Sequence, residues 1–210
     1  GDKVRKWIKD EQLSGIYVVE DTKRFYPNRN LAAHVIGFTG TDNQGLDGIE
    51  ATMDKYLKGT SGKILSEVDA GGREIPSNEQ KHIAPKKGNN VVLTIDETIQ
   101  YLAEKALEKA IKDYKILRGA TAIVMDPRNG DILALTSKPD FDLNNPFAAP
   151  EGVDASQWKG TTKEDIETLQ KTVWRNKAVV DTYEPGSTFK AVTSAAGLEE
   201  GVVKPDTPVT

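Results

Sequence analysis

The sequence contains no cysteine, and this absence removes several classes of protein. Without thiols there is no disulfide scaffold, no thiolate zinc site and no cysteine nucleophile. Histidine is almost as scarce, because His34 and His82 are the only two. A histidine-rich metal site is therefore excluded as well.

Long apolar runs and an excess of one charge are also missing. No run approaches the ~20 apolar residues that a membrane-spanning helix needs. The 210 residues carry a formal net charge of −4, and neither side of Pro85 is a basic module, so nucleic acid is not an expected partner. The chain opens with Gly1 rather than Met and has no signal peptide. We expect further chain before Gly1 and after Thr210, because residues 205–210 resemble the start of a loop.

Two polar, breaker-rich stretches, residues 76–81 and 85–90, mark the best domain boundary. We therefore predict a first domain at 1–85 and a second at 86–210. The first domain is expected to hold short strands and small helices. Its predicted elements are helices at 4–12 and 48–57 (ended by Gly59), strands at 15–20 and 63–68, a glycine turn at 69–73, and an apolar segment at 31–38 whose helix and strand interpretations are equally good.

The second domain has clearer patterns, and the fold class they indicate is α+β, with helices packed on an antiparallel sheet. Its predicted elements are a strand at 91–95, a long helix ending at Tyr114, a hairpin of 120–125 and 132–136 around an Asn-Gly turn, and helices at 162–173 and 187–196. The long helix starts either at a capping box of Thr94 with Glu97 or at Asp96. Its apolar stripe predicts that Glu104 and Glu108 face solvent.

A Ser-x-x-Lys motif, Ser187 to Lys190, opens the last predicted helix and carries the best candidate chemistry. Three residues of separation place both side chains on one helical face. A serine hydroxyl is a poor nucleophile until a neighbour accepts its proton, and a lysine amine does so only when its pKa falls. Unpaired amides at a helix start can bind an oxyanion, and the backbone amide of Ser187 is the obvious donor.

The motif alone is weak, because about one chance match is expected in a chain of this size. Ser156 and Lys159 form such a second match, but Gly160 follows and no apolar helical run does, so Ser156 is not our nucleophile. The competing interpretation of Ser187 is a helix-capping serine beside an exposed lysine.

The residues around Ser187 resemble the first active-site motif of the class B penicillin-binding proteins, the monofunctional peptidoglycan D,D-transpeptidases. The match is long, and other segments agree with the family in order along the chain. These segments are 176–190 at the motif; 24–27, 33–37, 45–50, 57–62 and 69–75, similar to the non-catalytic pedestal (dimerisation-type) domain; and 93–100 and 119–136, similar to the start of the transpeptidase domain. The subgroup it resembles is that of division and sporulation.

The resemblance implies roles for individual residues. Ser187 would be the acylated nucleophile, Lys190 its general base, and the Ser187 amide part of the oxyanion hole. Substrates would be peptidoglycan stem peptides ending in D-Ala-D-Ala, and β-lactams would acylate the same serine. Other cell-wall synthesis proteins, such as a polymerase, would bind the pedestal. No cofactor or metal is implied, and an amino-terminal helix outside this chain would anchor the protein on the outer side of the membrane.

The sequence departs from the family pattern in one respect. It contains neither Ser-x-Asn nor Lys-Thr-Gly, the two later motifs of the active site, which would fall after Thr210. We therefore predict little or no transpeptidase activity for these 210 residues alone. Two other classes remain open: a β-lactam sensor or serine β-lactamase, which the pedestal-like half disfavours, and a non-enzymatic scaffold with an idle serine.

The remaining candidates have structural interpretations that are at least as good. We expect His34 to be packed in the core and His82 to be solvated. Four aspartates near the hairpin lack the spacing of an EF-hand loop, so turn roles explain them better than a cation site. Their positions are Asp126, Asp131, Asp140 and Asp142. Asp181 and Glu184 could tune Lys190 or serve in turns, Trp174 and Phe189 are expected in the core, and an Arg24–Glu50 pair inside the pedestal is left undecided.

Overall fold

The computed structural model describes residues 2–13, 15, 16, 18, 22–65 and 81–208. Its contacts divide the chain into two compact units, Gly1–Ala178 and Val179–Thr210. Each unit is treated by itself below. In the described ranges, no helix is both long and apolar enough to cross a membrane.

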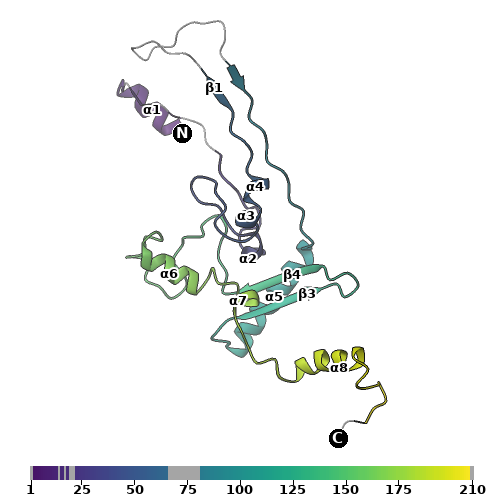
Figure 1. Cartoon of the computed structure of the whole chain (residues 1–210). Helices are drawn as coiled ribbons and strands as arrows, with labels where there is room; N and C mark the ends of the chain where they lie inside the picture. The colour runs from purple at the N-terminus through teal and green to yellow at the C-terminus, as the bar shows by residue number, and fades with distance from the viewer. Residues whose placement is uncertain (1, 14, 17, 19–21, 66–80, 209–210) are drawn as a thin grey trace. The chain divides into compact units, whose positions relative to one another are not determined.

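The first half of the chain contains short elements, as its sequence predicted (Figure 1). The helix predicted at 4–12 lies at Asp2–Asp10 (α1), and the undecided apolar segment forms a short helix. The elements here are α1 (Asp2–Asp10), α2 (Ala33–Ile36), α3 (Gly48–Thr52), α4 (Asp54–Leu57), β1 (Lys63–Leu65) and β2 (Lys81–Ile83), with β1 and β2 antiparallel. The glycine turn predicted at 69–73 lies outside the described residues, as does half of the strand predicted at 15–20.

The helix predicted at 48–57 is interrupted at Met53, which caps α3 and leads into α4. Its end differs from the prediction too, because Lys58 is extended and Gly59 has no left-handed backbone. Gly59 serves a close approach instead: a Cβ there would lie 2.2 Å from the carbonyl oxygen of Lys86. This approach accompanies the antiparallel bridge between Thr60 and Lys86.

Helix α5 (Glu97–Tyr114) is the long predicted helix, and Asp96 is its N-cap. The Asp96 carboxylate accepts a 2.9 Å hydrogen bond from the Ile99 amide. Thr94 is not the cap, because its hydroxyl donates to the carbonyl of Ile132 at 2.7 Å. The prediction of a strand at 91–95 is wrong, since no regular strand forms there.

The burial of α5 contradicts part of its predicted amphipathic pattern. Gln100 and Glu104 are buried, whereas Leu102 is 60% exposed. Polar groups occupy the buried face because they have partners there. Glu104 accepts from the backbone amide of Ala32 at 2.9 Å and from the Gln100 side chain at 2.7 Å. The prediction that Glu104 faces solvent is therefore wrong.

The predicted hairpin is present as β3 (Ala120–Met125) and β4 (Ile132–Lys138), paired antiparallel with an irregularity at Val124 and Met125. Helix α5 packs on both strands. The side-chain amide of Gln100 accepts from the Leu135 amide at 2.8 Å and donates to the Leu135 carbonyl at 3.0 Å, which fixes α5 to β4. Helix α6 (Lys163–Lys171) follows in the predicted range 162–173, and of the two possible caps, Thr161 and Thr162, Thr162 is the one that caps it.

The main hydrophobic core draws residues from both halves of the sequence. Phe38 is 1% exposed, and its ring lies 4.8 Å from that of Trp174 and 5.6 Å from that of Phe141. Leu143 and Leu169 complete this buried cluster from the second half. The division at 85/86 remains a prediction, but the segment around Phe38 shares its core with residues 141–174.

Candidate active site

The segment that carries Ser187 forms a short 3₁₀ turn, η1 (Gly186–Phe189), which continues directly into helix α8 (Lys190–Glu199). In a 3₁₀ turn the side chains at i and i+3 eclipse, so Ser187 and Lys190 share one face. Gly186 has φ +55, a left-handed conformation that favours glycine, and nothing lies within 4 Å of a Cβ placed there. The glycine therefore serves the backbone turn rather than a close packing contact in this unit.

The helix after the motif starts and ends three residues later than predicted. It runs through Gly197 and ends at Glu199, with Glu200 as its C-cap, and Gly201 adopts φ +66. The amides of Glu200 and Val202 donate to the carbonyls of Ala196 and Gly197 at 3.0 Å each. Gly201, not Gly197, therefore supplies the left-handed residue that ends the helix.

The motif is exposed over its whole length. Residues 181–196 are all exposed, Ser187 and Lys190 included. Within the described ranges there is no hydrogen bond between the Ser187 hydroxyl and the Lys190 ammonium, and no ion pair between Glu184 and Lys190. The Ser187 amide likewise donates to no backbone carbonyl there, which leaves it available as a donor. The three parts of the predicted site thus stand on one turn, without a surrounding pocket in this unit.

Phe189 was predicted to be a core residue, and this is wrong for the described chain, since it is 55% exposed. Val192, at 57%, and Val202, at 77%, are exposed in the same unit. A segment of this size has no second layer to cover its apolar side chains.

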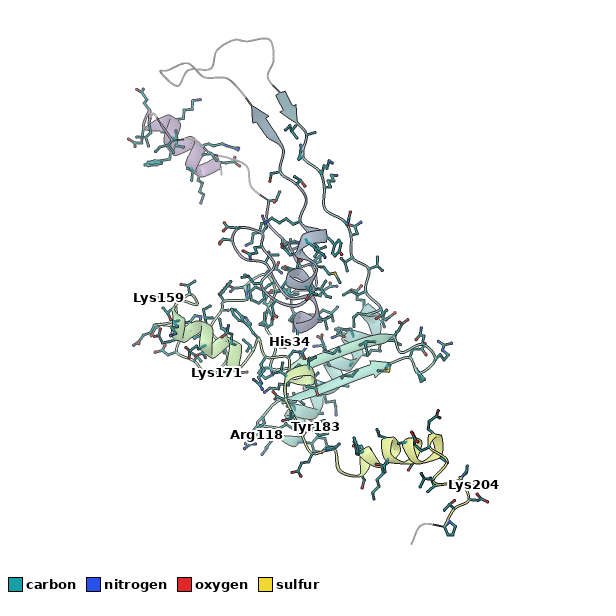
Figure 2. All side chains as sticks on the ribbon, viewed as in Figure 1. His34, Arg118, Lys159, Lys171, Tyr183 and Lys204 are labelled. Atoms are coloured by element: carbon teal, nitrogen blue, oxygen red, sulfur yellow. The ribbon has the colours of Figure 1, made fainter. Side chains whose placement is uncertain are left out.

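The predictions that His34 and Trp174 pack in the core are confirmed. His34, labelled in Figure 2, is buried, and its Nε2 lies 2.8 Å from the carbonyl oxygen of Val173. Burial is the main cause that lowers the pKa of His34. Trp174 packs on Phe38 and Phe147, as a core residue should. His82, predicted to be solvated, lies in β2, and its side chain is outside the part that the structure describes.

The four aspartates near the hairpin take part in turns and ion pairs. Asp126 pairs with Arg128 at 2.6 Å, and Asp131 accepts from the Asn129 side chain at 2.8 Å. Asp140 pairs with Lys138 at 2.6 Å, and Asp142 pairs with Arg29 at 2.7 Å. Across the part of the chain that is described, no three His, Asp or Glu side chains gather to hold a metal ion. The Arg24–Glu50 pair left undecided by the sequence forms at 3.1 Å.

One charged cluster escaped the sequence analysis. The Lys138 ammonium is buried between Glu108, at 2.9 Å, and Asp140, at 2.6 Å. Burial opposes its charge, but these two carboxylates prevail and raise the pKa of Lys138. Asp140 also accepts from the Asn30 side chain at 3.0 Å. A lysine that ends a largely apolar strand was the available signal, because such a cation needs acidic partners.

Two family models match the chain. The "Penicillin binding protein transpeptidase domain" matches residues 120–210, which include the Ser187 turn. The "Penicillin-binding Protein dimerisation domain" matches residues 5–93. Together they cover most of the sequence.

Curated relatives agree with these models. Stage V sporulation protein D of Bacillus subtilis is 41% identical over 93% of this chain and 27% of its own length. The peptidoglycan D,D-transpeptidase FtsI of Escherichia coli is 33% identical over 94% and 30%. The probable peptidoglycan D,D-transpeptidase PenA of Neisseria meningitidis is 35% identical over 95% and 31%. The chain therefore spans less than a third of the length of these relatives.

Solved structures give the same assignment of fold. A peptidoglycan synthetase from Bifidobacterium adolescentis superposes with a TM-score of 0.69 and 29% identity, over 99% of this chain and 34% of that chain. The penicillin-binding protein PBP2 from Helicobacter pylori, solved in complex with MreC, gives a TM-score of 0.63 and 27% identity, over 97% and 38%. The α+β prediction, with pedestal and transpeptidase regions, is confirmed.

Proposed function

Because this chain belongs to the class B penicillin-binding proteins, we propose that the protein containing it cross-links peptidoglycan by acyl transfer through Ser187. The observation that carries the proposal is the turn at 186–190. It presents a hydroxyl, an amine and an unpaired amide together, inside the segment that matches the transpeptidase model.

The reaction divides into two acyl transfers. Lys190 accepts the Ser187 proton as the hydroxyl oxygen attacks the carbonyl of the penultimate D-alanine, and the Ser187 amide stabilises the oxyanion. The peptide bond breaks, the leaving amine takes the proton, and D-alanine departs. An amine of a second stem peptide then attacks the ester, which forms the cross-link and returns the proton to Ser187. A β-lactam would acylate the same oxygen and block the second step.

The 210 residues alone are proposed to be inactive. A lysine amine acts as a base where it is buried beside other positive charge, and in this chain Lys190 is exposed. The sequence also lacks the Ser-x-Asn and Lys-Thr-Gly motifs that complete the site in the family.

Labelling by a fluorescent penicillin tests both statements. The full-length protein should form a covalent adduct that persists for hours, Ser187→Ala should abolish it, and Ser156→Ala, the matched control, should retain it. Labelling of Ser187→Ala would contradict the nucleophile. Clear labelling of the 210-residue chain would contradict its inactivity, and rapid hydrolysis of the adduct would indicate a β-lactamase instead.

The cellular setting is proposed from the relatives. The similarity to a sporulation protein and to FtsI supports a role in spore or septal wall synthesis. We place the protein outside the cytoplasmic membrane, anchored by an amino-terminal helix that precedes this chain. The PBP2–MreC complex supports cell-wall synthesis proteins as partners of the pedestal. Loss of membrane association in the full-length protein after removal of its first helix would test the anchor.

A further inference from the structure

A cavity of about 370 Å³ lies between three segments of the first unit, and none of its lining residues belongs to the unit that carries Ser187. Its walls are residues 22–24 with Tyr26, residues 39–41 with Asn43, and residues 143–147. This volume suits one sugar ring better than a peptide segment or a second protein. The proposed acyl transfer does not use this cavity.

Hydrogen bonds hold the walls in place before any ligand binds. The side-chain amide of Asn144 accepts from the Tyr26 amide at 3.0 Å and donates to the Tyr26 carbonyl at 2.8 Å. The Asn43 side chain donates to the Thr22 carbonyl and, at 3.2 Å, to the Thr22 hydroxyl. The wall that contains Thr22 and Tyr26 is thus joined to each of the other two walls. A preformed site loses little free energy on ordering when a ligand enters.

The charged side chains that line the cavity are all positive. It contains Lys23 and Arg24 and no carboxylate. Glu50 neutralises Arg24 from outside the lining, through contacts of 3.1 Å to Nε and 3.2 Å to Nη2, and this leaves Nη1 unengaged by that carboxylate. Lys23 has no ion pair within the described ranges, so it supplies the net positive charge. Such a lining favours an oxyanion over a neutral or cationic group.

The other lining groups suit a ligand in which the oxyanion is attached to a ring with several hydroxyl groups. The hydroxyl of Thr41 and the side-chain amide of Asn145 can donate to or accept from sugar hydroxyls. Phe147 and Pro146 add apolar surface on which the C–H face of a sugar ring can rest. Convergent polar groups over an apolar floor are the usual composition of a small-molecule site.

We propose that this cavity binds an acidic sugar, a ring that carries a carboxylate or a phosphate, with Lys23 and Arg24 on the oxyanion. The choice of a cell-wall sugar as the probe rests on the proposed function, whereas the binding site itself does not depend on acyl transfer. A second contact with the glycan would keep the protein on its polymeric substrate between turnovers.

Equilibrium binding of three related sugars to the full-length protein tests the proposal. N-acetylmuramic acid carries a carboxylate, N-acetylglucosamine 6-phosphate carries a phosphate, and N-acetylglucosamine is neutral. At least one acidic sugar should bind tenfold or more tightly than the neutral one, and the tighter of the two identifies the source of the oxyanion. Equal binding of all three, or no binding of either acidic sugar, would overturn the proposal.

Matched variants locate the binding. Lys23→Glu should weaken the acidic sugar at least tenfold, because it reverses the unpaired charge at an exposed position where folding is not at stake. Lys204→Glu makes the same change in the other unit and should leave binding unaltered. Equal weakening by both would mean a diffuse charge effect and overturn the site. Ser187→Ala should bind the sugar normally, so failure of the acyl-transfer proposal is read separately from failure of this one.

Discussion

The unit before Ala178 and the unit after it satisfy their side chains in different ways. In the first, the apolar rings of Phe38, Phe141 and Trp174 pack on one another, and no buried side-chain polar atom in the described part lacks a partner. In the second, Phe189 and Val202 are largely exposed, and so is the candidate nucleophile. The comparison teaches that a local turn can fix the spacing of catalytic groups, whereas their environment must come from a larger body of protein.

The largest expected loss in the free energy of unfolding comes from truncating a core side chain of the first unit. Phe38→Ala removes a fully buried ring that contacts Trp174, so the free energy of unfolding should fall by about 3–5 kcal/mol. Denaturant unfolding followed by tryptophan fluorescence measures this loss. The matched change Phe189→Ala in the exposed unit should cost less than about 1 kcal/mol in the 210-residue chain. Equal losses would erase the contrast between the units.

Removal of the buried cation should have the next largest effect. Lys138→Met leaves the carboxylates of Glu108 and Asp140 without their shared partner, and we expect a loss of about 3 kcal/mol. Lys171→Met is the control, because its 3.2 Å pair with Glu167 lies on the surface and should matter by less than about 0.5 kcal/mol. The same unfolding titration compares the two, and a neutral Lys138→Met would mean that water replaces the ammonium.

Acid should weaken the first unit through His34. Its pKa in the folded state lies below the ordinary value of 6.5, mainly because burial disfavours the charged ring. Below pH 6.5 the unfolded chain therefore binds a proton that the folded chain does not, so stability falls as the pH drops from 6.5 towards the folded pKa. The groups that face the ring electrostatically are Asp140, Asp47 and Lys138.

The unfolding midpoint measured between pH 8 and pH 5 should show this decline. In His34→Gln the decline over the same range should be smaller, since glutamine can still donate to the Val173 carbonyl but does not titrate. An identical slope in both proteins would assign the effect to other groups.

The smallest expected change in stability is at an exposed residue of the second unit. Val192→Ser changes a residue that is 57% exposed, so the 210-residue chain should change in stability by less than about 0.5 kcal/mol. In the full-length protein the same substitution should cost clearly more, if additional chain covers this helix. Thermal unfolding of both proteins, with and without the substitution, provides the four values needed. Equal costs would mean that α8 stays uncovered.

Local patterns in the sequence predicted the elements that have strong local signals. The stripe and cap of α5, the Asn-Gly hairpin and the Thr162 cap of α6 all depend on neighbours within a few residues. The burial of Glu104 could not be predicted, because its partner, the Ala32 amide, lies 72 residues away. The strand predicted at 91–95 failed for a similar reason, since β-propensity needs a partner strand to take effect.

The candidate site divides in the same way. The shared face of Ser187 and Lys190 follows from their spacing, and the resemblance to the family assigned their roles. The exposure of Phe189 was not predicted, because an apolar residue beside an active site is expected to be covered. The sequence shows that the later motifs are missing but not which surfaces that part of the protein would bury.

The bonds between Gln100 and Leu135 bear on how this sheet can grow. On the outer side of β4, the side-chain amide of Gln100 takes the place of a neighbouring strand, because it bonds both the amide and the carbonyl of Leu135. In the described part of the chain, no side chain blocks the edge of β3 that faces away from β4 in this way. Within the described residues, the β4 edge of the hairpin is therefore blocked at Leu135, and the β3 edge is open to pairing. An additional strand that joined this sheet would therefore pair at the edge of β3 rather than beside Leu135.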